Sequence, residues 1–144
     1  LKLARFLLVL SRNEFLTLLR DHDFGNSLHS SYVERLHEFV DKVERKVYFF
    51  QDISVKAHFD EFSGALQVFS RKLVECGRTT GADHQLITTK PAAVMDDDMR
   101  HRWRAEVQEL NELATEAYRR LDKLVDFLVE RFPVVADELI PPQG

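Results

Sequence analysis

The sequence predicts an all-α fold, and three observations support this. Apolar residues recur three and four positions apart over long stretches, which is the period of an α-helix. The 144 residues include only 5 glycines and 4 prolines, whereas β-sandwiches and barrels need many turn residues. Hydrophobic residues make up 44% and charged residues 31%, which allows a packed core beneath a solvated surface. We therefore expect one domain over residues 1–144, an antiparallel helical bundle or long helical hairpin of three to five helices.

The first helix is expected over about residues 2–22. Within it, Ser11-Arg12-Asn13-Glu14 is a capping box, in which a serine and a glutamate side chain each satisfy a backbone amide, so we expect a helix to start at Ser11 and run to about His22. The segment before Ser11 is then either a separate short helix or a continuation of the same helix with an internal polar turn. The preceding run, Leu1–Leu10, is apolar nearly all round, so we expect it to lie inside the assembly or beneath a partner. The run is too short to span a membrane, which takes roughly 20 apolar residues. The sequence leaves open whether residues precede Leu1.

Two further helices are expected over about residues 31–50 and 55–76. The first begins at a second capping box, and both carry apolar residues at alternating three- and four-residue steps. The apolar phase slips between them, at residues 51–54. The slip predicts either a kink in one long helix or a hairpin, with Asp52 or Ser54 capping a new helix.

Residues 77–95 are expected to form a long mobile loop. Gly77, Gly81 and Pro91 interrupt any helix there, and the four threonines of this stretch disfavour helix as well. A loop of this length in a small domain is usually functional or disordered.

The longest helix is expected over residues 97–132. Asp96, Asp97 and Asp98 lie at its start, where negative charge complements the helix dipole, and Pro133 ends it. Eight apolar residues along it keep a strict heptad spacing, which predicts coiled-coil-like packing. We expect them to form the interface of a homodimer, packing against a second copy or against the preceding helices. They are Trp103, Val107, Leu110, Ala114, Ala117, Leu121, Leu124 and Leu128.

Charge and cysteine content restrict the partners and the compartment. The net charge is -4 and the C-terminal third is acidic, which argues against nucleic acid, because nucleic-acid binders carry a basic face. The single cysteine, Cys76, cannot form an internal disulfide and lies on an apolar stripe. We expect it to be a small buried hydrophobe in a cytoplasmic protein.

No metal site or cofactor is predicted. Glu34 and His37 have the Glu-x-x-His spacing of di-metal carboxylate bundles. Glu34, however, lies about 160° from the core-facing Leu36 on a helical wheel, so it faces solvent. His58 lacks the lysine that follows the histidine of phosphotransfer domains, and two acids lie beside it instead.

Arg78 and His84 suggest one catalytic alternative. Small helical nucleases of the HEPN type carry an arginine, four to six residues and then a histidine, and this pair cleaves RNA at a dimer cleft without metal. Arg78 and His84 have that spacing. So loose a pattern is expected by chance, and this one falls in a glycine-containing loop instead of at a helix start.

The sequence therefore favours a non-enzymatic module for protein–protein interaction or oligomerisation. Its partner would be a second copy of the chain, in a homodimer, or a different protein. The strict heptad run, the many phenylalanines and the apolar N-terminal run support this expectation. A HEPN-like RNA-cleaving enzyme is one alternative. An accessory or regulatory subunit of a neighbouring protein is another, and its sequence features would be the same as those of an interaction module.

Overall fold

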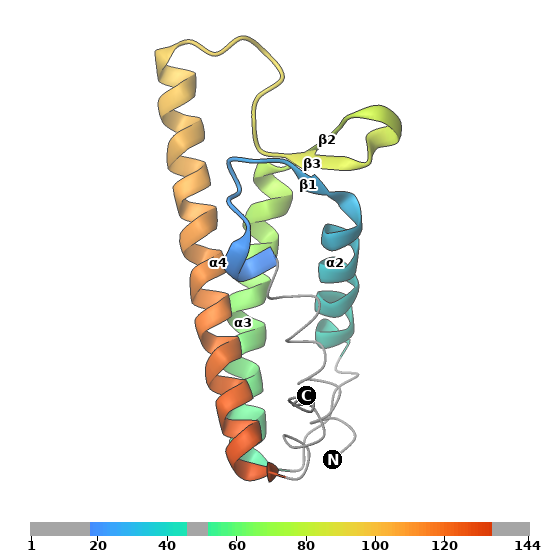
Figure 1. Ribbon diagram of the computed structural model, residues 1–144, viewed down its shortest axis with the longest axis vertical. Helices are drawn as coiled ribbons and strands as arrows, with labels where there is room; N and C mark the ends of the chain where they lie inside the picture. The colour runs from blue at the N-terminus through green and yellow to red at the C-terminus, as the bar shows by residue number, and fades with distance from the viewer. Residues whose placement is uncertain (1–17, 46–51, 134–144) are drawn as a thin grey trace, which may run out of the picture.

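The computed structural model describes residues 18–45 and 52–133, and these residues are mostly helical (Figure 1). Three long helices run along the long axis of the molecule, and a small sheet lies across one end. The helices are α2 (Ser30–Glu44), α3 (Ile53–Cys76) and α4 (Asp97–Arg131). The prediction of a mostly helical chain is confirmed, whereas the expectation that it contains no strands is wrong.

The sheet occupies much of the stretch expected to be a mobile loop. Its strands are β1 (Leu28–His29), β2 (Arg78–Thr80) and β3 (Leu86–Thr88), and the short 3-10 helix η2 (Ala82–His84) joins β2 to β3. The order is β1-β3-β2 with antiparallel pairing throughout. Strands of two or three residues are too short to show a period-two pattern. The threonines that disfavour helix are β-branched residues that favour strands.

The tip of the β2–β3 hairpin uses left-handed backbone conformations. Gly81 has a φ of 83°, and a Cβ there would lie 3.2 Å from the Cδ1 of Leu86. Asp83 and His84 follow with φ values of 58° and 53°. Only short polar residues and glycine adopt such angles at small cost.

Helices α3 and α4 form the main packing unit, and three ion pairs between them define their direction. Lys72 Nζ lies 3.2 Å from Glu109 Oε2, and Arg120 Nη1 lies 3.1 Å from Glu61 Oε2. At the far end, Arg131 Nη2 lies 3.0 Å from Asp52 Oδ2. Residue numbers rise along α3 as they fall along α4, so the two helices are antiparallel.

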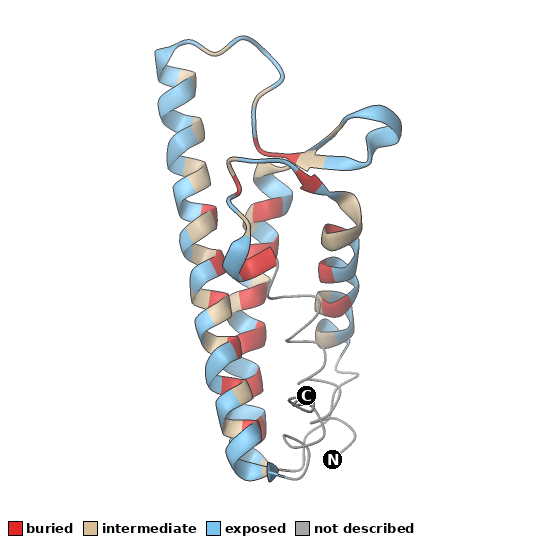
Figure 2. Ribbon diagram, in the orientation of Figure 1, coloured by how far each residue is buried: buried red, intermediate tan, exposed pale blue. Residues whose placement is uncertain are grey.

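The apolar stripes predicted for α3 and α4 face each other in the core (Figure 2). All the stripe residues of α3 from Val55 to Leu73 are buried, and Cys76 is partly buried. On α4 the buried residues are Leu110, Ala114, Ala117, Leu121, Leu124 and Leu128. Phe62, Phe69 and Phe24 are fully buried beside them and supply much of the core volume.

The slip at residues 51–54 marks the start of a new helix. Asp52 has an extended backbone and its Oδ1 accepts hydrogen bonds from the amides of Ser54 and Val55, so α3 begins at Ile53. Helices α2 and α3 run side by side in opposite directions (Figure 1). The hairpin alternative is therefore the one observed.

Helix α2 is shorter than predicted. It ends at Glu44, not residue 50, and residues 46–51 lie outside the described residues. Its N-cap is His29, whose ring nitrogen accepts from the Ser31 amide, so the predicted cap at Ser31 is wrong. Helix α2 follows β1 directly and begins at Ser30, two residues earlier than the capping box predicts.

The helix predicted over 2–22 falls mostly outside the described residues. Only a wide, π-type helical turn over residues 18–21 is described, and it carries the buried Leu18 and Leu19. The capping box at Ser11 and the apolar run Leu1–Leu10 also lie outside.

Candidate functional site

Most of the heptad residues expected at a subunit interface are core residues of the single chain. The six from Leu110 to Leu128 are buried against α3 and its neighbours. Trp103 and Val107, nearer the start of α4, are only half-buried. The sequence left open whether the last helix packs against a second copy or against the preceding helices. Within one chain, it packs against the preceding helices.

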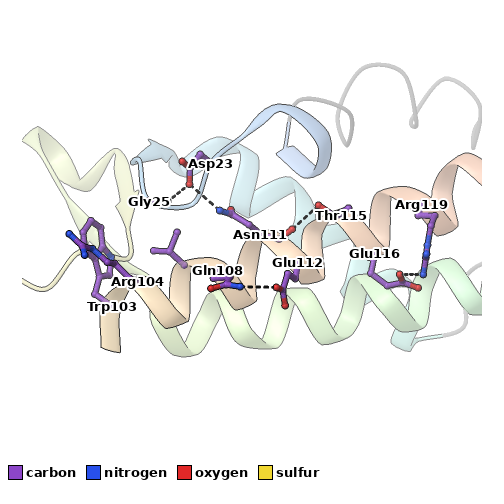
Figure 3. A pocket seen from close by; sticks show the side chains of 11 residues that line it. Asp23, Gly25, Trp103, Arg104, Gln108, Asn111, Glu112, Thr115, Glu116 and Arg119 are labelled. Atoms are coloured by element: carbon purple, nitrogen blue, oxygen red, sulfur yellow. Dashed lines mark hydrogen bonds and ion pairs between the residues drawn. The ribbon is translucent and has the colours of Figure 1, made fainter. Parts of the chain in front are cut away.

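Trp103 and Val107 line an open groove where α4 passes the turn that contains Asp23 and Gly25 (Figure 3). The groove has a volume of about 540 Å³, and polar or charged side chains surround its two apolar ones, Trp103 and Val107. Its floor is α4 from Trp103 to Arg119, and one wall is the turn that contains Asp23 and Gly25. Four helical turns of α4 therefore share one accessible surface with a segment distant in sequence.

Asn111 fixes the wall of the groove to its floor. Its Oδ1 accepts from the amide of Phe24 at 3.0 Å, and its Nδ2 donates to Asp23 Oδ1 at 3.1 Å. The same Asp23 oxygen accepts from the Gly25 amide at 2.9 Å. The Gly25 amide and then Asn111 hold the pKa of Asp23 below its usual range, because both stabilise the carboxylate.

A buried threonine joins the groove to the sheet. Thr89, just after β3, donates its hydroxyl to the Phe24 carbonyl at 2.7 Å. The hydroxyl oxygen of Thr89 in turn accepts a hydrogen bond from the indole Nε1 of Trp103 at 3.1 Å. The Phe24 ring is fully buried and packs edge-on against Phe69 of α3. Hydrogen bonds and packing therefore set the orientation of Trp103 before any ligand arrives.

The polar side chains of the groove are not all used within the chain. Gln108 donates to Glu112, and Glu116 pairs with Arg119. Arg104 has no hydrogen-bond or ion-pair partner among residues 18–45 and 52–133, and it is exposed. The groove thus presents a free guanidinium beside a half-buried indole.

The structure does not bring Arg78 and His84 together in one chain. Arg78 pairs with Thr88 at the open end of the hairpin, and its Nε donates to the Lys90 carbonyl at 2.9 Å, directed away from the tip. His84 lies at the tip, beyond the last paired residue, Thr80. Both side chains are exposed.

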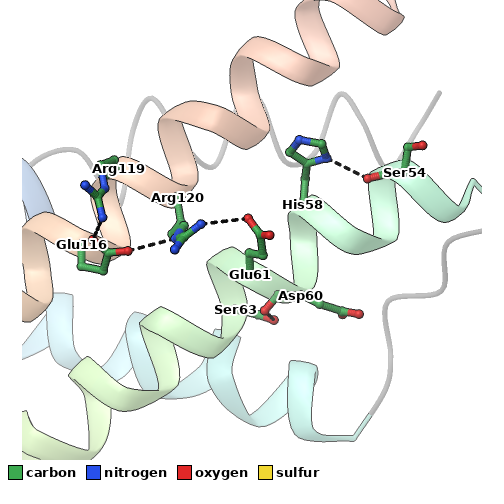
Figure 4. A network of polar contacts seen from close by, with 8 residues as sticks. All are labelled: Ser54, His58, Asp60, Glu61, Ser63, Glu116, Arg119 and Arg120. Carbon is green, nitrogen blue, oxygen red and sulfur yellow. Dashed lines mark hydrogen bonds and ion pairs between the residues drawn. The ribbon is translucent and has the colours of Figure 1, made fainter.

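A second polar network, between α3 and α4, is structural (Figure 4). Arg120 bridges Glu61 of α3 and Glu116 of its own helix, at 3.1 Å and 2.9 Å. His58 donates from Nδ1 to the Ser54 carbonyl at 2.8 Å and stacks on Phe127, with ring centroids 4.3 Å apart. These contacts hold the two helices in register.

Metal binding and membrane insertion find no support in the described residues. Within them, no three His, Cys, Asp or Glu side chains gather where they could hold a metal ion. Glu34 and His37 are exposed on α2. None of the helices in residues 18–45 and 52–133 combines the length and apolar character that crossing a bilayer requires.

Burial raises the pKa of the Cys76 thiol, which disfavours the reactive thiolate.

Sequence reasoning placed Trp103 and Val107 at an interface but missed the residues that shape the groove. Asn111 follows a core leucine on a polar helix, and Thr89 is one of four threonines in the presumed loop. Neither carries a local signal, because their partners in the turn at residues 23 and 24 lie 65 to 88 residues away in the chain.

Comparison of the chain with protein-family models, with curated proteins and with solved structures finds no match.

Proposed function

We propose that the chain is a non-enzymatic module for protein–protein interaction, and that the groove along α4 is its binding surface. The observation that carries this proposal is the preorganised groove itself. An aromatic anchor, Trp103, and an aliphatic neighbour, Val107, lie in a recess with a polar rim, which is the composition typical of protein-binding hot spots.

The rigidity of the groove adds to the argument. Affinity is lost when a binding surface must be ordered on association. The Asn111 and Thr89 hydrogen bonds already fix both the wall and the indole. The floor is a helix, and a helix-lined groove four turns long suits an amphipathic helix or an extended peptide.

Binding can be tested with the single tryptophan of the chain. Peptides are selected against the whole protein from a phage-displayed random library, and their binding is followed by Trp103 fluorescence. We expect the selected peptides to change the emission and to lose at least about tenfold in affinity with Val107→Arg, because a charge would replace the apolar floor.

Val74→Arg is the matched control, since Val74 is 61% exposed on α3 and lies outside this groove. It should leave peptide affinity unchanged. Selected peptides that bind the Val107 variant as well as the original protein would show that the groove is not the binding surface.

The assembly predicted from the sequence, a homodimer with coiled-coil-like helix packing, belongs to the same proposal. With the stripe from Leu110 to Leu128 turned toward α3, the outer face of α4 is open to a partner. Light scattering after size exclusion, over a concentration series, measures the assembly directly.

A further inference from the structure

The outer face of α4 carries an ordered pattern of charge. Between Asp97 and Arg119, seven charged residues lie within about 80° of Gln108 on the helical wheel, at 100° per residue. One of them, Asp98, has the uncharged Tyr118 as its counterpart, and the same face carries four more charges beyond Arg119 whose counterparts would fall before the start of α4. In chain order the signs of the other six are negative, positive and positive before Gln108, then negative, negative and positive after it. The residues are Asp97, Arg100, Arg104, Glu112, Glu116 and Arg119. This face is opposite the buried stripe that packs on α3.

The pattern inverts its sign about Gln108. Arg104 lies four residues before Gln108, and Glu112 lies four residues after it. Arg100 and Glu116 are each eight residues away, and Asp97 and Arg119 are each eleven away. Two copies of this helix laid antiparallel, with their Gln108 residues adjacent, would oppose unlike charges at all three distances.

We propose that a second copy of this chain docks on this face, with the two α4 helices antiparallel and a two-fold axis at Gln108. The proposal rests on the proposed function, since it names the partner of the same groove. In an isologous dimer each contact occurs twice. Three kinds of contact, Arg104–Glu112, Arg100–Glu116 and Asp97–Arg119, therefore give six ion pairs along about 33 Å of helix.

The sign inversion favours a second copy over a foreign partner. Two-fold symmetry requires self-complementarity, whereas a foreign surface needs only to match whatever charges it meets. Arg104 supports this choice, because it has no partner among the described residues although its helix neighbours are paired. A facing Glu112 would supply one.

The seam of this interface is polar, which limits its strength. Exposed ion pairs contribute little each and are screened by salt, and the apolar side chains of the groove, Trp103 and Val107, lie about 140° and 100° from Gln108 on the helical wheel, at or beyond the edge of the contact. We therefore expect a reversible dimer whose dissociation constant rises about tenfold between low and high salt.

Charge reversal tests the register. Arg104→Glu alone and Glu112→Arg alone each place like charges opposite one another twice in a homodimer, and each should weaken dimerisation at least about tenfold. Mixing the two variants restores both pairs, so they should form a heterodimer. The double variant Arg104→Glu/Glu112→Arg should dimerise like the original chain. Sedimentation velocity compares the two single variants, their mixture and the double variant with the original chain.

Arg102→Glu and Glu75→Arg are the controls, because both residues are exposed and neither takes part in the proposed pairing. Circular dichroism establishes that each variant is folded. A monomeric original chain at all concentrations would overturn the proposal, as would single variants that still dimerise or a mixture that stays monomeric. If selected peptides still bind at Val107 in that case, only the identity of the partner is refuted. If they do not, the proposed function fails too.

Discussion

The two halves of α4 carry the same heptad pattern but have different surroundings. From Leu110 to Leu128 every heptad residue is buried, because α3 lies alongside. Trp103 and Val107 continue the pattern toward the helix start yet remain half-exposed. The pair Lys72–Glu109 lies near the end of α3, which stops at Cys76. A heptad pattern therefore predicts which face of a helix is apolar, but the length of the neighbouring helix decides whether that face becomes core or binding surface.

The largest expected effect is a difference in stability between variants that truncate one side chain in each half of α4. Leu124 is fully buried, so Leu124→Ala should lower the free energy of unfolding by about 2–5 kcal/mol, from lost burial and the cavity left behind. Val107→Ala should cost about 1 kcal/mol or less, because its side chain already contacts solvent. Urea denaturation followed by circular dichroism measures both. Equal losses would show that both halves of α4 are core.

The buried hydroxyl that supports the groove should give an intermediate effect. Thr89→Val keeps the shape of the side chain but leaves the Phe24 carbonyl and the Trp103 indole without their partner. We expect a loss of about 1–3 kcal/mol in stability and a shift of tryptophan emission to longer wavelength as the indole meets water. Thr79→Val, at an exposed strand position, should change neither. An unchanged emission spectrum for the Thr89 variant would remove the link between sheet and groove.

The smallest expected effect is that of acid on stability. A fall in pH should loosen the wall of the groove before it affects the helical core. The pKa of Asp23 is lowered in the folded protein by the Gly25 amide and Asn111. Its contribution to stability is therefore present above about pH 4 and is lost as the pH falls through the lowered pKa. Asp23→Asn should flatten the dependence of stability on pH below about pH 4, because it lowers neutral stability by the contribution of the carboxylate and leaves stability in acid little changed. Denaturation curves at pH 3, 5 and 7 would show it, and an equally steep acid loss in the variant would assign it to other carboxylates.

Local sequence patterns predicted the helical part of the molecule well. The stripe on α3 from Val55 to Leu73 and the stripe on α4 from Leu110 onward are core. Asp52, one of two predicted caps, caps α3, and Asp96, expected at the start of the last helix, caps α4. Each of these features depends on residues within a few turns of one another, and so the sequence period shows them. The end of α2 at Glu44 was missed, because its apolar spacing continues past that residue.

The candidate site could be predicted only in part. Trp103 and Val107 were identified as apolar and important, but the groove they line depends on Asn111, Thr89 and the Asp23 turn. Those residues become neighbours only through tertiary packing. Strand β1 was missed for the same reason, because it lies 57 or more residues from its partner β3. Strands β2 and β3 are close in sequence, but three residues each are too few to show a period-two pattern.

The bonds that shape the groove also bear on the order of folding. Phe24 and Thr89 are 65 residues apart, and Phe24 and Asn111 are 87 apart, so these contacts close some of the longest loops in the chain. Closing a longer loop costs more entropy, and such contacts form late unless other structure shortens the search. We expect the α3–α4 hairpin to gain hydrogen-exchange protection first and the Phe24 amide to be among the last. A half-folded chain would then have its helices but no groove, so that only the completed fold could recognise a partner.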